Sequence, residues 1–315
     1  MEGTSFYFEW EVKLIEWLQT YIGNFGVKLS SFFSLFGEET LILLVFFTMY
    51  WCVNKQAAKI MGTNLLIALV LNPFIKNLVL RRRPYMDNAG IQCLKPVTSD
   101  ADIYDISAQG YSFPSAHSLN SCVMYGSLTT VWKNKAFKIA MFGLVFFVGF
   151  SRITVGVHYP TDVLVGWTLG LIILLVVPFI YNKVNNKNIF RIIVFAISCI
   201  GVIFCRTEDY FTGLGAMAGF FMAIPFEEKY VPFKETRHPV ACVLRVAGGL
   251  GLYFLINTLL KLPFSKGFLA NGTLPALLVR AARYMIIIFI LFAIYPIAFI
   301  KVDKMMHKEG KKSKD

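Results

Sequence analysis

The chain contains two histidines whose neighbours could support nucleophilic chemistry. His158 lies in a short stretch between two apolar runs, six residues after Arg152 and four residues before Asp162. A carboxylate at this spacing can bond one ring nitrogen, which selects the tautomer and stabilises the imidazolium. A lone ion pair at a membrane surface would also explain the stretch. The pattern makes His158 a candidate nucleophile, Asp162 its orienting carboxylate and Arg152 a candidate anion ligand.

The second histidine, His117, follows Pro114, Ser115 and Ala116 at the start of an apolar run. Proline in the first turn of a helix leaves the next backbone N–H groups without helical partners, and such groups bind anions. Simple helix capping would explain the proline and the serine but not the histidine. We therefore expect His117 to act as an acid or base, with Ser115 and Ala116 holding an anion.

Basic residues complete this set. Lys76 lies near the end of an apolar run, and Arg83 follows seven residues later, directly after Arg81 and Arg82. Snorkelling at a membrane surface would explain these cations singly. An arginine fork matches phosphate oxygens and a lysine adds a point charge, so with two histidines they indicate phosphoryl transfer. Arg81 and Arg82 are candidate headgroup contacts. The sequence has no cluster typical of a metal cage, so no metal or other cofactor is expected.

The elements that must position these residues are membrane helices. Of 315 residues, 56% are hydrophobic and 16% are charged, a composition that excludes a disordered chain. Runs of about 17–25 mainly apolar residues predict an all-α polytopic membrane protein. We expect about nine transmembrane helices, near residues 39–54, 59–80, 115–132, 137–156, 161–182, 189–206, 210–226, 240–261 and 277–300.

Residues 6–22 have a different pattern. Aromatic and aliphatic residues recur at helical spacing, but Glu9, Glu11, Lys13 and Glu16 interrupt them. This pattern favours an amphipathic helix that lies in the membrane interface. A first true span is the alternative.

The net charge of +12 follows the expected topology. Alternation of the nine helices puts 17 Lys and Arg on the side of the C-terminus and 13 on the side of the two histidine motifs. The positive-inside rule therefore places the C-terminus in the cytoplasm and the motifs on the non-cytoplasmic face. Basic charge on an apolar chain also argues against nucleic-acid binding.

Ten residues in the order Lys-x6-Arg-Pro, Pro-Ser-x-His and Ser-Arg-x5-His-x3-Asp resemble the signature of the type 2 phosphatidic acid phosphatase superfamily. The resemblance covers about residues 39–182. One departure is Ala116, where the family usually has glycine; the backbone N–H is kept. The longer C-terminal part resembles enlarged bacterial members, which have as many spans as sphingosine-phosphate and glucose-6-phosphate phosphatases.

The resemblance implies a metal-independent phosphoric monoester hydrolase in a bacterial plasma membrane, acting on a lipid phosphate among membrane lipids. It implies that His158 forms a phosphohistidine, that Asp162 orients it, and that His117 protonates the leaving group and then activates water. The residues expected to hold the phosphate are Lys76, Arg83, Ser115, Ala116 and Arg152. Alternatives are a polyprenyl (undecaprenyl) diphosphate phosphatase, or a non-hydrolytic lipid-phosphate transporter or scramblase.

The expected organisation has four parts. Residues 1–38 form the interfacial helix and residues 39–188 the catalytic core of about five spans. Residues 189–300 form a four-span extension, and residues 301–315 a basic cytoplasmic tail.

Overall fold

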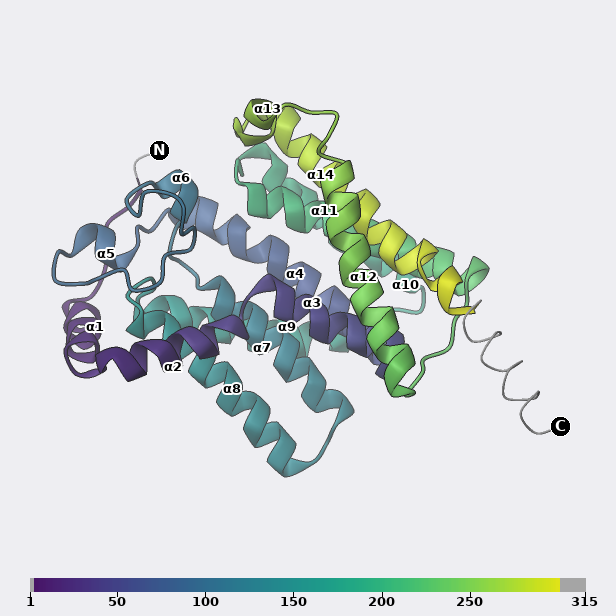
Figure 1. The fold of residues 1–315 in the computed structure, drawn as a ribbon, viewed down its shortest axis with the longest axis horizontal. Helices are drawn as coiled ribbons and strands as arrows, with labels where there is room; N and C mark the ends of the chain where they lie inside the picture. The colour runs from purple at the N-terminus through teal and green to yellow at the C-terminus, as the bar shows by residue number, and fades with distance from the viewer. Residues whose placement is uncertain (1–2, 301–315) are drawn as a thin grey trace. The chain divides into compact units, whose positions relative to one another are not determined.

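The computed structural model describes residues 3–300, and the regular secondary structure in this range is helical, with no β-strand (Figure 1). An isolated bridge joins Thr4 to Arg81. The expected all-α class is therefore confirmed for the described residues. The tail expected at residues 301–315 lies outside them. The chain divides into two compact units. Unit 1 comprises Met1–Leu43, Ile67–Lys183 and Ile203–Cys205, and unit 2 comprises Leu44–Leu66, Val184–Val202 and Arg206–Asp315.

Unit 1 carries all the residues expected to do chemistry. Its helices are α1 (Glu9–Tyr21), α2 (Gly23–Leu35), α5 (Pro84–Asp87), α6 (Ile106–Gln109), α7 (Ala116–Val131), α8 (Lys135–Thr154) and α9 (Pro160–Lys183). Two further helices, α3 (Glu39–Thr48) and α4 (Lys55–Val79), run through both units.

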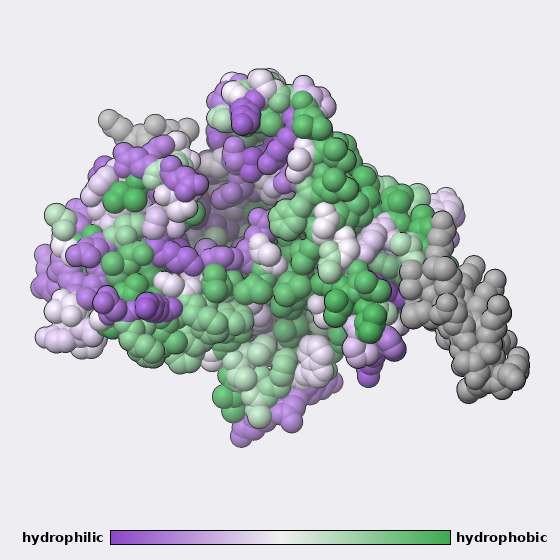
Figure 2. Space-filling view, in the orientation of Figure 1, coloured by the Kyte–Doolittle hydropathy of each residue, from purple (hydrophilic) through white to green (hydrophobic). Residues whose placement is uncertain are grey.

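Close helix packing in unit 1 brings the two histidine motifs to one place. Helix α7 packs against both α8 and α9, and α2 packs along α8. A Cβ atom at Gly166 of α9 would lie 2.8 Å from the carbonyl oxygen of Ser115. Only glycine therefore lets α9 approach the start of α7 this closely. Figure 2 shows apolar residues over much of α8, and its exposed Ile139, Phe142 and Phe146 suit contact with lipid.

Helix α1 packs on the connection between α8 and α9 and on the segment after α4. Its Ile15 is buried in a cluster with Tyr85, Val157 and Tyr159. The opposite face leaves large aromatic side chains exposed, among them Trp10, Trp17 and Tyr21. Helix α1 therefore has one buried face and one exposed aromatic face.

Unit 2 is built from η1 (Met49–Val53), α10 (Lys187–Ser198), η2 (Cys199–Ile203), α11 (Glu208–Tyr230), α12 (Pro239–Leu259), α13 (Lys266–Ala270), α14 (Leu274–Phe289) and η3 (Ile290–Ile294). Gly215 lets α11 approach α14, since a Cβ there would lie 2.1 Å from the Ala281 carbonyl oxygen. Aromatic rings fill the core, with Phe46 and Tyr50 at 5.4 and 4.8 Å from Phe292 between ring centroids. This packing places Leu44–Leu66 in unit 2, whereas the sequence predicts a catalytic core over residues 39–188.

Five helices within residues 3–300 are long and apolar enough to cross a membrane: Lys55–Val79, Lys135–Thr154, Pro160–Lys183, Pro239–Leu259 and Leu274–Ile300. The pair Gly23–Leu35 and Glu39–Val53, bent by 45°, makes a sixth if it is one broken span. All nine expected runs fall on helices, but three of them do not meet this test: those on α7, α10 and α11. The count of nine stays a prediction.

Candidate active site

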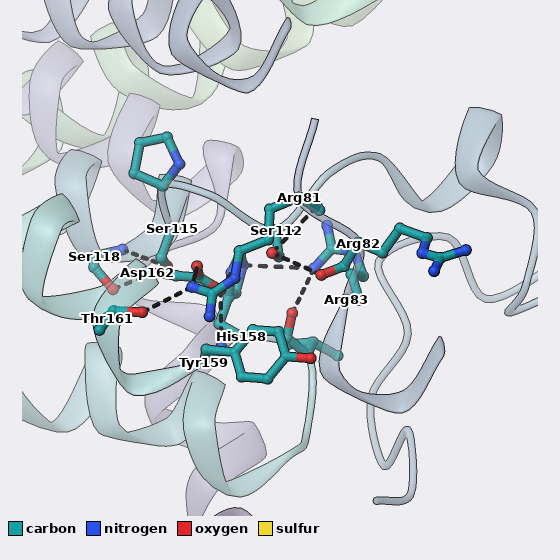
Figure 3. A network of polar contacts seen from close by, with 12 residues as sticks. Arg81, Arg82, Arg83, Ser112, Ser115, Ser118, His158, Tyr159, Thr161 and Asp162 are labelled. Atoms are coloured by element: carbon teal, nitrogen blue, oxygen red, sulfur yellow. Dashed lines mark hydrogen bonds and ion pairs between the residues drawn. The ribbon is translucent and has the colours of Figure 1, made fainter. Parts of the chain in front are cut away.

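His158 and Asp162 lie together at the junction of α8 and α9 (Figure 3). Nδ1 of His158 is 3.4 Å from Oδ2 of Asp162, and the other ring nitrogen, Nε2, is 3.5 Å from Nη1 of Arg83. Both side chains are buried. A carboxylate beside Nδ1 favours the tautomer with its proton on Nδ1, which leaves the lone pair of Nε2 available for nucleophilic attack.

A tight turn positions His158. Gly156 has a φ of +77°, and a Cβ there would lie 2.3 Å from the carbonyl oxygen of Gln92. Glycine meets both demands. The turn lets the His158 amide donate to the Arg152 carbonyl oxygen at 3.2 Å, and the Tyr159 amide donate to Oδ2 of Asp162 at 2.8 Å. The first turn of α9 thus brings the side chains of His158 and Asp162, four residues apart in the sequence, into contact.

Burial lowers the pKa of His158 well below its ordinary value, and the charges of Arg83, Lys76 and Arg152 lower it further. Each of these cations makes the protonated imidazolium less favourable. His158 is therefore neutral at neutral pH, which is the state that a nucleophile requires.

The start of α7 brings the second motif to the first. Ser115 is the N-cap residue, and its Oγ accepts from the Ser118 amide at 3.4 Å and from the Ser118 hydroxyl at 2.9 Å. The Ser115 amide donates to the Asp162 carbonyl oxygen at 3.0 Å. The sequence predicts Pro114 in the first turn, but the helix begins at Ala116, so Pro114 lies just before it. The amides of Ala116 and His117 remain in the first turn, where helices bind anions.

Two of the three cations expected to hold the phosphate are buried arginines. Arg152 is 2% exposed and donates from Nη1 to Oγ of Ser34 at 2.5 Å, while its Nε has no partner among residues 3–300. Arg83 is fixed by backbone carbonyl oxygens, with Nη2 at 2.6 Å from Gln109 and Nη1 at 2.9 Å from Val157. The third cation, Lys76, lies in the last turn of α4 and is close enough for its charge to affect His158. Arg83 therefore contacts His158, and the charges of all three cations act on it.

The structure corrects the expected role of Arg81. Its guanidinium is buried, not turned to a headgroup, and Nη1 lies 2.7 Å from Oδ1 of Asp162. Its Nη2 lies 2.9 Å from Oε2 of Glu11. The neighbouring Arg82 is partly exposed and pairs with Asp87 at 2.8 Å. Adjacent residues of this run thus lie in different surroundings, a distinction that a run of arginines does not reveal.

Three residues of the site could not be recognised from the sequence. Glu11 and Ser34 contact Arg81 and Arg152 from the N-terminal helices. Gln109 bonds to the segment after α5, where its Oε1 accepts from the amides of Val97 and Thr98 at 3.0 and 3.2 Å. Its carbonyl oxygen accepts from Arg83. All three are common polar residues far from the motifs, so no local pattern distinguishes them.

Two protein-family models match the chain. Residues 57–186 match the model of the PAP2 superfamily, and residues 211–308 match that of the transmembrane extension of PAP2 superfamily phosphatases. No solved structure matches the chain.

Three curated relatives match 42%, 45% and 44% of the chain. They are a lipid A 4'-phosphatase of Porphyromonas gingivalis, 30% identical, a dolichyldiphosphatase of Saccharomyces cerevisiae, 31% identical, and an undecaprenyl-diphosphatase of Sulfolobus acidocaldarius, 31% identical. The matched segments span 55%, 58% and 63% of those relatives. With its apolar helices and the extension, the chain is an integral membrane protein. The chain thus carries a PAP2 superfamily domain, followed by the transmembrane extension of PAP2 superfamily phosphatases.

Proposed function

We propose that the protein is a membrane phosphatase that hydrolyses the phosphate monoester of a lipid phosphate, with His158 as the nucleophile. The observation that carries this proposal is the placement of His158, with Nδ1 beside Asp162 and Nε2 facing Arg83. Cations beside a nucleophile suit phosphoryl transfer, in which positioning and charge stabilisation supply most of the catalysis.

The reaction has two steps. In the first, the lone pair of His158 Nε2 forms a bond to phosphorus while the bond from phosphorus to the lipid oxygen breaks. The negative charge of the bound phosphate favours the protonated form of His117, which gives its proton to that oxygen, and Asp162 stabilises the positive charge on the phosphorylated ring. In the second step, His117 takes a proton from water, the water oxygen attacks phosphorus, and the N–P bond breaks to release phosphate.

The phosphoryl oxygens are held by Lys76, Arg83 and Arg152, and by Ser115 and Ala116 at the start of α7. The unpartnered Nε of Arg152 supports this assignment, because a buried guanidinium N–H without an acceptor is costly unless a ligand completes it. An arginine fork also matches phosphate oxygens better than a lysine does.

The substrate class rests on the membrane setting. A lipid keeps its apolar part in the bilayer, so only its phosphate must reach the cations. The relatives leave a second candidate, a polyprenyl diphosphate, because two of the three reported above are named as diphosphatases. The engagement of Arg81 with Asp162 and Glu11 removes one of the two arginines that could have held a second phosphate.

Nine spans remain our proposal for the membrane arrangement, with α1 in the interface, the site on the non-cytoplasmic face and the C-terminus in the cytoplasm. Residues 39–188 then carry the catalysis and residues 189–300 form the extension. The exposed aromatic face of α1 and the basic excess on one side support this topology. An impermeant thiol reagent should label Glu9→Cys in intact cells, and Lys314→Cys only after permeabilisation. The reverse labelling would invert the topology.

Phosphate release by the purified protein tests the function. We would compare lipid monophosphates of several chain lengths, a polyprenyl diphosphate and a soluble phosphate ester. We expect kcat/KM to be highest for a lipid monophosphate, and His158→Ala to abolish turnover. His238→Ala, at an exposed histidine, is the matched control and should keep wild-type turnover. Binding without phosphate release would instead indicate a transporter or scramblase.

A further inference from the structure

Helix α1 carries a buried carboxylate that its sequence does not explain. Glu11 is 0% exposed, while Glu9, two residues away, pairs only with Lys13 on an exposed surface. Both oxygens of Glu11 are used. Its Oε1 accepts from the amide and the hydroxyl of Thr161 at 2.9 and 2.6 Å, and its Oε2 accepts from the Phe8 amide at 3.0 Å. A buried charge with this many partners has a defined place in the structure.

Arg81 connects Glu11 to the site. Its guanidinium bridges two carboxylates, with Nη2 at 2.9 Å from Glu11 Oε2 and Nη1 at 2.7 Å from Asp162 Oδ1. It also lies between two rings, 4.0 Å from the centroid of Tyr159 and 4.6 Å from that of Phe6. Arg81 therefore has no freedom to turn toward a ligand.

The charges in this arrangement explain why Glu11 is needed. Arg81 by itself would cancel the charge of Asp162, and a neutral pair stabilises an imidazolium poorly. With Glu11, the three side chains carry one net negative charge, and Asp162 presents it to His158 at 3.4 Å. When His158 becomes positively charged, the whole cluster reaches neutrality inside a buried site, where charges are weakly screened.

We propose that Glu11 is a positioning residue that, through Arg81, holds Asp162 in place and keeps its negative charge available to His158. This inference rests on the proposed function, because it assigns a role to Glu11 in forming the phosphohistidine. It makes the N-terminal helix part of the catalytic unit, since α1 brings Glu11 to the opening turn of α9.

The test compares Glu11→Gln with the exposed matched control Glu9→Gln, using phosphate release from a lipid monophosphate in detergent. Glu11 does not touch the substrate, so we expect kcat to fall roughly ten- to a hundredfold with KM nearly unchanged. Glu9→Gln should keep the wild-type kcat. Glu11→Asp, which retains the charge, should lose less than Glu11→Gln.

The pH profile separates this role from a purely structural one. The charged and titratable groups that act on His158 are Asp162, Arg83, Lys76, Arg152 and His117. Removing the charge of Glu11 disfavours the protonated imidazolium, so the acidic limb of kcat/KM should move to lower pH. The double variant Glu11→Gln/Arg81→Gln restores a net charge of −1 and should return the limb toward its wild-type position.

If kcat falls in Glu11→Gln but the acidic limb does not move, Glu11 has only a structural role and the inference is overturned. A wild-type kcat in Glu11→Gln would also overturn the inference. If Glu11→Gln fails to fold, as judged by size-exclusion chromatography and thermal unfolding, Glu11→Asp and the double variant decide. The double variant must then show the wild-type limb, and a shifted limb refutes the charge argument. The wild-type protein and His158→Ala are assayed in parallel. If the wild-type protein shows no turnover, the proposed function itself is overturned. If the wild-type protein turns over and His158→Ala does not, the proposed function stands and only the role of Glu11 is in question.

Discussion

Replacement of Asp162 by Asn probes the chemistry of His158 with almost no change in shape. Both oxygens of the carboxylate accept from donors: Oδ1 from Arg81 at 2.7 Å, and Oδ2 from the Tyr159 amide at 2.8 Å and from His158 Nδ1 at 3.4 Å. An asparagine has one oxygen for these two sides. Either its NH₂ group faces Arg81, placing donor against cation, or it faces the Tyr159 amide and His158.

The second arrangement changes the tautomer of His158. An NH₂ group beside Nδ1 favours a lone pair there, which moves the proton to Nε2 and removes the nucleophile. The same exchange in a Ser-His-Asp triad lowers kcat by about 10⁴. The 3.4 Å contact is longer than a strong hydrogen bond, so we expect a smaller loss of about 10³ in kcat, or roughly 4 kcal/mol in the barrier.

The assay is the formation of phosphohistidine in a single turnover. Enzyme in excess over a labelled lipid monophosphate is quenched in alkali, which preserves the N–P bond, and the rate of protein labelling is followed. Asp100→Asn, in the exposed segment after α5, is the matched control and should label at the wild-type rate. A loss of less than tenfold in Asp162→Asn would refute the idea that this carboxylate sets the tautomer of His158.

Four further predictions concern the same site. Because burial and neighbouring cations lower the pKa of His158, the nucleophile stays neutral on acidification and the acidic limb of kcat/KM should lie below pH 6.5; a limb above that value contradicts this. His117→Ala should accumulate phosphohistidine, visible by alkaline quench, since it cannot activate water; a variant that turns over normally would exclude that role. Turnover should continue in excess chelator, and recovery only on adding Mg²⁺ would show that the expectation of no metal is wrong. Gly156→Ala should lower the free energy of unfolding by about 1–3 kcal/mol, because its φ of +77° and the nearby Gln92 carbonyl oxygen oppose a Cβ. The loss is measured as a lower thermal unfolding midpoint. Gly143→Ala, with open space around it, should not lower the midpoint.

The N-terminal region shows what a helical sequence pattern can and cannot predict. The spacing of aromatic residues in 6–22 predicts an amphipathic helix, and the structure has α1 at Glu9–Tyr21 with Trp17 and Tyr21 exposed. The same pattern cannot say which acidic residue is buried. Glu9 and Glu11 differ only in their place around the helix, and that difference matters only once α1 docks on Thr161 and Arg81.

The run of three arginines shows the same limit. The Lys-Arg-Pro spacing identifies Arg83, and its buried guanidinium does face His158. Arg81 and Arg82 are identical in type and adjacent in sequence, so composition predicts one role for both. After α4 the two side chains point in different directions. That of Arg81 is buried against two carboxylates, and that of Arg82 is partly exposed beside Asp87.

The sequence by itself determined the helical class, the membrane setting and the residues of the three motifs, because apolar runs and short spacings are local properties of the chain. It determined the contact of His158 with Asp162 for the same reason, since four residues at a helix start bring two side chains together. Only the tertiary structure decided that Glu11, Ser34 and Gln109 support the site. These residues reach it across 70 or more positions, or by folding of the segment after α5, and such contacts depend on the packing of whole helices.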